Sequence, residues 1–100
     1  MTAQKIEMPV QEIADLCRRY QVRELAVFGS YLREDFRPDS DIDLLVEFDP
    51  DAEIGFLSFA RMGRELSDIL HRPVDLVPKA GLKPKIRDQV LSSRKVLYAA

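Results

Sequence analysis

Asp41-Ile42-Asp43-Leu44-Leu45-Val46-Glu47-Phe48 is the most regular segment of this sequence, and its pattern is that of a β-strand. Apolar and polar positions alternate along it, because neighbouring side chains of a strand point to opposite faces of a sheet. Ile42, Leu44, Val46 and Phe48 share one face, whereas Asp41, Asp43, Leu45 and Glu47 share the other. The alternation therefore places two carboxylates, those of Asp41 and Asp43, on the same face of the predicted strand.

Helical and strand patterns alternate on both sides of this segment. Apolar residues recur every three or four positions over residues 9–20 and 55–70, and again at Leu82, Ile86 and Val90, which predicts three helices. Short apolar runs at 24–28, 74–77 and 96–98 predict further strands. Residues 30–35 predict a short helix or helical turn, and residues 36–40 predict a loop. This order predicts an α/β or mixed α+β fold, with one small sheet flanked by helices.

Length and composition restrict the class of protein further. With 100 residues, the chain is predicted to form one domain over 1–100, with residues 1–8 as a flexible N-terminus. A net charge of −2 and a sequence pI near 5.4 argue against nucleic-acid binding. The single cysteine, Cys17, excludes an internal disulfide and is predicted to be a buried thiol. No signal peptide or membrane-spanning segment is recognisable, so a cytoplasmic protein without membrane contact is expected.

Gly29-Ser30 stands where the first predicted strand meets the short helix. Glycine allows a phosphate to approach the backbone closely, and the amides that open a helix can bind it together with the Ser30 hydroxyl. A Gly-Ser pair after a strand is more often a simple turn. The two residues are therefore candidate phosphate ligands only in combination with other features.

Three carboxylates provide that combination. Asp41 and Asp43 are placed to share a divalent cation such as Mg²⁺, which prefers oxygen ligands. Asp75 stands alone in the apolar run 74–77, where an ionised acid is costly unless it is paired, hydrogen-bonded or bound to metal. If the two strands are neighbours, the three carboxylates converge without a Lys or Arg in either strand, and a cation relieves their repulsion. The alternatives are a solvated strand end for the first two and an edge strand on which Asp75 faces water.

Together these segments resemble the nucleotidyltransferase superfamily that includes DNA polymerase β, and within it the minimal nucleotidyltransferases. The Asp-x-Asp begins eleven residues after Ser30, and the matching segments are 29–33, 40–46 and 74–77, followed by a similar tail over 82–98. The resemblance covers nearly the whole chain from Glu24 onward. It implies a single-domain nucleotidyltransferase fold.

The resemblance also implies a magnesium-dependent enzyme. A nucleoside triphosphate, ATP by analogy with the family, would lie against Gly29 and Ser30, and two Mg²⁺ ions held by Asp41, Asp43 and Asp75 would flank its α-phosphorus. Asp75 would in addition help to remove the proton of the attacking hydroxyl.

Two further residues complete the predicted nucleotide site. Arg33 is expected either to contact the phosphates or to brace the loop, and Ser40 is either a ligand or the turn residue before the strand.

Free-standing minimal nucleotidyltransferases of this size resemble antitoxins that are paired with a small helical HEPN toxin. In that family the antitoxin uses ATP to place AMP on a tyrosine of the toxin. The resemblance therefore implies a HEPN-type partner and a hetero-oligomer. Two other hypotheses stay open: a binding module that neutralises its partner by covering it, with weak catalysis, and a drug-modifying nucleotidyltransferase with a small-molecule pocket.

The sequence departs from the family pattern at Leu32 and Glu34, where a small residue and a glycine are usual. Glu34 either weakens triphosphate binding by its charge or points to solvent. His71 is expected to be a capping or surface residue. Phe56 and Phe59 are expected in the core, unless one of them belongs to a partner surface.

Overall fold

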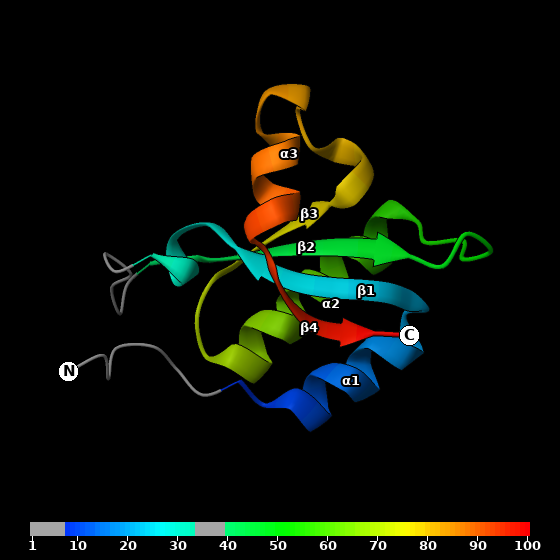
Figure 1. Ribbon diagram of the computed structural model, residues 1–100. Helices are drawn as coiled ribbons and strands as arrows, with labels where there is room; N and C mark the ends of the chain where they lie inside the picture. Colours follow the sequence, from blue (N-terminus) through cyan, green and yellow to red (C-terminus); the bar gives the residue numbers. More distant parts are fainter. Residues whose placement is uncertain (1–7, 34–39) are drawn as a thin grey trace.

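The computed structural model describes residues 8–33 and 40–100, which form a four-stranded sheet with helices on both faces (Figure 1). The strands are β1 (Val22–Phe28), β2 (Ile42–Phe48), β3 (Val74–Pro78) and β4 (Lys95–Ala99), in the order β3-β2-β1-β4. The helices are α1 (Val10–Arg19), α2 (Phe56–Leu70) and α3 (Pro84–Ser93), with two short 3-10 helices, η1 (Gly29–Leu32) and η2 (Lys79–Gly81). The predicted class, a small mixed sheet flanked by helices, is confirmed.

The sheet is mixed in direction. β1 is antiparallel to both β2 and β4, whereas β2 is parallel to β3. Parallel neighbours need a crossover connection, and α2 provides it by running between β2 and β3 along the chain. The two acidic strands are therefore neighbours, as the sequence analysis required for convergence of their carboxylates.

One face of the sheet carries the main core. Ile42, Leu44 and Val46 of β2 are buried on this face, as the alternation predicts. α1 and α2 cover them with Ile13, Leu16, Cys17, Met62, Leu66 and Leu70, all buried. This apolar layer supplies most of the hydrophobic stabilisation of the fold.

The opposite face is only partly covered. It carries Asp43, Leu45 and Glu47 of β2, and within the described part of the chain α3 is the one α-helix above it (Figure 1). A second, smaller apolar cluster joins Leu45 to Leu82 and Val90 there. Because this cover is small, acidic side chains on the same face remain accessible to solvent.

The end of α2 explains how β3 is placed. The last residue of α2 is Leu70, and His71 caps the helix. His71 is exposed and adopts a left-handed conformation with φ of 58°, as expected of the capping or surface residue that the sequence predicts. Its backbone N–H donates a hydrogen bond to the carbonyl oxygen of Ser67. The Ser67 hydroxyl oxygen in turn accepts a hydrogen bond of 3.1 Å from the backbone N–H of Val74. The first residue of β3 is thus tied directly to the last turn of α2.

Two aromatic residues of α2 have different surroundings. Phe59 is partly buried against the main core, with its ring centroid 6.3 Å from that of Phe48 in an edge-to-face arrangement. Phe56 is 82% exposed in the first turn, so its expected place in the core is wrong and the alternative of a partner surface stays a prediction. The reason is that α2 begins at Phe56, where the chain approaches from the loop and has not yet reached the sheet.

The remaining predictions agree in most respects. Cys17 is a buried free thiol, and burial raises its pKa to about 12. The predicted helix at 30–35 is a 3-10 helix over Gly29–Leu32, after which Arg33 is extended. Glu34, the predicted loop up to residue 39 and residues 1–7 lie outside the described residues. Over residues 8–33 and 40–100, no helix is both long and apolar enough to span a bilayer.

Candidate active site

Asp43 and Asp75 are partners across the parallel pair of strands β2 and β3. Residues paired in register project from the same face of a sheet, and neighbouring strands lie about 4.8 Å apart. The antiparallel register with β1 pairs Asp43 with Phe28, so Gly29 follows immediately beside the same carboxylate. Three segments that are distant in the sequence thus bring two carboxylates and the Gly-Ser pair to one end of the sheet.

Gly29 is needed at this place because of Asp43. Its φ is 72°, a left-handed conformation that residues with a Cβ atom rarely adopt. A Cβ atom built on Gly29 would lie 2.2 Å from Oδ2 of Asp43, which is closer than any real contact. The close approach of a phosphate to this glycine stays a prediction; in the structure the glycine makes room for the carboxylate that the strand register brings against it.

The carboxyl group of Asp43 is electrostatically strained. Burial raises its pKa, and the neighbouring carboxylates of Asp75 and Asp41 raise it further. A hydrogen bond from the backbone of Ser30 and the charge of Arg33 offset part of this rise. The predicted repulsion within the carboxylate group is therefore present, and a cation at this place would relieve it.

Asp41 and Ser30 lie on the rim of the site. Asp41 precedes the first residue of β2, and its side chain is exposed. The Ser30 hydroxyl donates a hydrogen bond of 3.5 Å to the backbone carbonyl of Asp41, which links η1 to the start of β2. Arg33 is exposed at the end of η1 and acts on Asp43 through its charge. The structure thus groups these residues around Asp43.

For Asp75 the sequence left two alternatives: a buried acid that needs a partner, or an acid that faces water on an edge strand. An acid inside an apolar run was expected to be costly without a partner, yet Asp75 is exposed. The reason is that β3 is an edge strand, so the alternative of an acid that faces water on an edge is the one observed. The assignment of Asp75 to the site therefore rests on its register with Asp43 and not on a cost of burial.

The carboxylates are suited to a cation that is shared with a substrate. Among residues 8–33 and 40–100, no three His, Cys, Asp or Glu side chains are arranged so that they could hold a metal ion by themselves. Mg²⁺ is usually bound by one or two carboxylates together with phosphate oxygens and water, and not by a cage made only of protein ligands. The pair Asp43 and Asp75, with Asp41 beside it, provides oxygen donors of this kind and fits Mg²⁺ bound together with a triphosphate.

Two residues near the site were not singled out for it by the sequence analysis. Arg72 donates from Nη1 to the backbone carbonyl of Ser40 over 3.5 Å. Tyr31 is buried beside it; burial raises the pKa of its hydroxyl, and the charge of Arg72 lowers it in part. The sequence feature that could have indicated Arg72 is its position two residues before β3, the strand that carries Asp75. Leu32, one of the departures from the family pattern, packs against the main core.

Comparison with known proteins agrees with this geometry. Residues 11–97 match the family described as nucleotidyltransferase domain. Over 84 residues the chain is 42% identical to the protein adenylyltransferase MntA of Thermococcus cleftensis, which covers 84% of this chain and 81% of that protein.

Two solved structures share the fold. A chain of a toxin–antitoxin structure with AMP-PNP has a TM-score of 0.74 at 23% identity, covering 93% of this chain and 75% of that one. A complex of a tri-AMPylated Shewanella oneidensis HEPN toxin with its MNT antitoxin contains a chain with a TM-score of 0.65 at 22% identity, covering 91% and 70%. At these identities the likeness is one of fold, whereas the sequence matches over most of the chain establish kinship. This chain therefore belongs to the nucleotidyltransferase family.

Proposed function

We propose that this protein is an antitoxin that transfers AMP from magnesium-bound ATP to a tyrosine of a HEPN toxin and thereby neutralises it. The observation that carries the proposal is the pairing of Asp43 with Asp75, with Gly29 packed against Asp43. The 42% identical relative is named a protein adenylyltransferase, and a fold neighbour is held in complex with an AMPylated HEPN toxin. These relationships support both the reaction and the kind of acceptor.

Each site residue has a role in this proposal. Asp41 and Asp43 would hold the cations, and Asp75 would hold one of them and accept the proton of the tyrosine hydroxyl. When bound, Mg²⁺ supplies charge neutralisation for the triphosphate. Ser30 would contact the phosphates next to Gly29.

Arg33 and Ser40 complete the proposed nucleotide contacts. Arg33 already acts on Asp43 through its charge, and Ser40 directly precedes the Asp-x-Asp. A guanidinium beside the carboxylates is suited to phosphate oxygens.

Each AMP would be transferred in one displacement step at the α-phosphorus. The tyrosine oxygen forms a bond to the α-phosphorus, the bond from that phosphorus to the bridging oxygen of the β-phosphate breaks, and pyrophosphate leaves with the electron pair. The proton of the tyrosine goes to Asp75. Positioning and charge neutralisation are the main contributions that a protein makes to reactions of this type.

The test is to incubate the purified chain with ATP, Mg²⁺ and the product of the neighbouring gene, and to determine the masses of both intact proteins. We expect the partner to gain one or more AMP units, and we expect this gain to be lost in Asp43→Asn. Asp68→Asn is the matched control, because Asp68 is exposed on α2 at the opposite face of the sheet.

The same experiment distinguishes the alternatives. An unchanged partner mass in a stable and inactive complex would overturn the proposal in favour of neutralisation by binding alone. Modification of an aminoglycoside-like small molecule, without any modification of the partner, would point to a drug-modifying enzyme.

A further inference from the structure

The C-terminal part of the chain is strongly basic, although the protein as a whole is acidic. Residues 79–95 contain six cations, Lys79, Lys83, Lys85, Arg87, Arg94 and Lys95, and one acid, Asp88, which gives this segment a net charge of +5. Because the whole chain has a net charge of −2, the remaining residues carry −7. This segment includes α3, the helix on the same face of the sheet as Asp43.

α3 is barely packed against the rest of the protein. Of its ten residues only Val90 is buried, and residues 84–89 are all exposed. Ile86 is 43% exposed, although it lies one helical turn from both Leu82 and Val90, which do pack on the sheet. An isolated helix of this length is marginal in water, and most helices are stabilised by the burial of one face.

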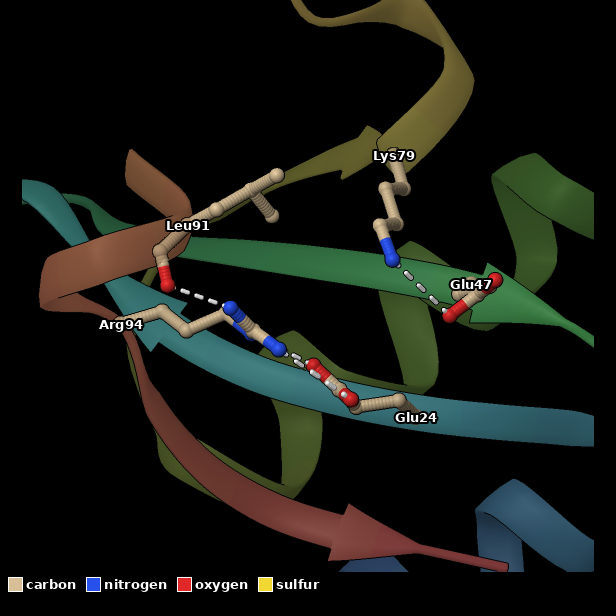
Figure 2. A network of polar contacts seen from close by, with 5 residues as sticks. All are labelled: Glu24, Glu47, Lys79, Leu91 and Arg94. Atoms are coloured by element: carbon tan, nitrogen blue, oxygen red, sulfur yellow. Dashed lines mark hydrogen bonds and ion pairs between the residues drawn. The ribbon is translucent and has the colours of Figure 1, made fainter. Parts of the chain in front are cut away.

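Two ion pairs hold α3 in place instead (Figure 2). Before the helix, Lys79 Nζ lies 3.3 Å from Glu47 of β2, and after it Arg94 Nε lies 2.6 Å from Glu24 of β1. Arg94 also donates to the backbone carbonyl of Leu91, which closes the last turn of the helix (Figure 2). The helix is therefore fixed at both ends, and Glu24 and Glu47 beneath it are already paired with a cation.

The cations in the middle of this arrangement remain without such partners. Within residues 8–33 and 40–100, the side chains of Lys83, Lys85 and Arg87 form no ion pair. Arg87 borders a cavity of about 380 Å³ between α3, η2 and the end of β2, which Pro78, Ala80 and the ion-paired Lys79 and Glu47 also line. An acidic side chain of another molecule would find both charge and room there.

From this arrangement we infer that α3 is a docking helix for an acidic surface of the acceptor protein, with Ile86 as its apolar contact. The inference rests on the proposed function, because the hydroxyl that receives AMP must reach Asp43 and Asp75 from the face on which α3 stands (Figure 1). An acceptor that approaches this face also meets α3, which stands on it. Its complementary charge would speed encounter and set its orientation.

A protein fits this surface better than a nucleic acid. The carboxylates of Asp41, Asp43 and Asp75 occupy the same side of the molecule and would repel a phosphate backbone. The exposed Ile86, between Lys85 and Arg87 in the first turn of α3, is an apolar contact of the kind found at protein interfaces. The basic segment is therefore assigned to an acidic patch on a protein.

The test is charge reversal at two exposed cations, Lys85→Glu with Arg87→Glu, in the full chain. Arg61→Glu with Arg64→Glu is the matched control, since both arginines are exposed on α2 at the opposite face and the change in net charge is the same. The probe is the product of the neighbouring gene. Its Kd is measured by titration without ATP, and KM and kcat for AMP transfer are measured with ATP and Mg²⁺.

For Lys85→Glu with Arg87→Glu we expect a Kd and a KM at least about tenfold higher, with kcat within about twofold, and a weaker dependence of Kd on salt. The control variant should match the parent chain in Kd, KM and kcat, and thermal unfolding of Lys85→Glu with Arg87→Glu should be unchanged. A Kd equal to that of the control, or a loss confined to kcat, would overturn the inference. So would binding of a single-stranded RNA oligonucleotide that is abolished by the reversal while the Kd for the protein is unaltered.

Failure of the proposed function is separable from failure of the docking helix. If the parent chain binds the partner but transfers no AMP, the proposed reaction is wrong, and the titration without ATP still decides whether α3 forms the interface.

Discussion

Oδ2 of Asp43 lies so close to Gly29 that a Cβ atom at this glycine would be 2.2 Å from it. The contact joins the end of β1 to the start of β2, and it fixes the carboxylate beside the residue that follows the first strand. A backbone position and a candidate metal ligand therefore depend on one another. A substitution at Gly29 acts on the site through Asp43.

Gly29→Ala is expected to lower both stability and activity. The left-handed φ of 72° and the displacement of Asp43 together should decrease the free energy of unfolding by about 2 kcal/mol. Gly63→Ala is the control, because nothing lies within 4 Å of a Cβ atom there and the residue is inside α2. That control should gain about 0.5–1 kcal/mol, as alanine favours helices. Urea unfolding measures the free energy of unfolding of both variants. Equal changes in the two would contradict the proposed role of Gly29.

Asp43→Asn is expected to abolish AMP transfer and yet to stabilise the protein. Because the pKa of Asp43 is raised in the fold, its ionised form is disfavoured there, and the penalty is present above the pKa of the folded state. Removal of the charge should increase the free energy of unfolding at pH 7 by up to about 1 kcal/mol, since solvent screens part of the repulsion. Urea unfolding without Mg²⁺ measures this, and a less stable variant would show that the carboxylates do not repel one another.

Stability at acid pH should depend on Glu65. The Tyr20 hydroxyl donates to Glu65, and Arg19 Nη2 lies 3.1 Å from it; the hydrogen bond from Tyr20 is the main cause of the lowered pKa of Glu65. The pKa of Glu65 in the fold is below its ordinary value of 4.5. The ionised Glu65 therefore contributes fully to the free energy of unfolding above pH 4.5, and this contribution is lost as the pH falls through the pKa of the folded state. Glu65→Gln should cost about 1 kcal/mol at pH 7 and progressively less in acid. Glu53→Gln, at an exposed position, should show no such trend.

Arg94→Met should loosen α3. The variant loses the ion pair with Glu24 and the hydrogen bond to the carbonyl of Leu91, in surroundings where both charged side chains are about one fifth exposed. We expect a loss of about 1.5–3 kcal/mol in urea unfolding. Arg94→Lys should restore only part of it, because an ammonium group cannot replace the planar guanidinium. Lys95→Met is the control at the exposed neighbouring position, and an equal loss there would refute the role of Arg94.

Cys17 should be unreactive in the folded protein. It is fully buried between α1 and the sheet, and burial raises its pKa to about 12, so almost no thiolate forms at pH 8. A maleimide reagent should modify it only after unfolding, and the rate in increasing urea should follow the unfolded fraction. Rapid modification of the native protein would show that α1 opens locally.

Much of the fold was predictable from local patterns. The alternation from Asp41 to Phe48 places β2 and both of its faces, and the helical spacing from Gly55 to Leu70 places α2. Asp41 and Asp43 were identified because they share one face of the predicted strand, and Asp75 because an acid is unusual in a short apolar run. These features need only the periodicity of a single segment.

Features that depend on the register between strands, or on which helix faces are covered by the rest of the protein, were not predictable. The contact between Gly29 and Asp43 follows from the antiparallel pairing of β1 with β2, which the sequence does not specify. Arg72 reaches the backbone of Ser40 only because α2 returns the chain to the start of β2. The spacing of Leu82, Ile86 and Val90 predicted a helix but not the exposure of Ile86, since an apolar stripe has the same pattern whether the chain itself covers it or not.

The parallel pairing of β2 with β3 also determines when the site can exist during folding. β1 and β2 are consecutive strands, whereas β3 joins β2 only after α2 has crossed the sheet. Contacts between segments distant in the chain cost loop-closure entropy and slow folding. Asp43 can therefore meet Gly29 before it meets Asp75, and a nascent or partly unfolded chain holds half of the site without the other half. The proposed site is therefore complete only when β3 has joined β2, so the proposed activity would require the finished fold.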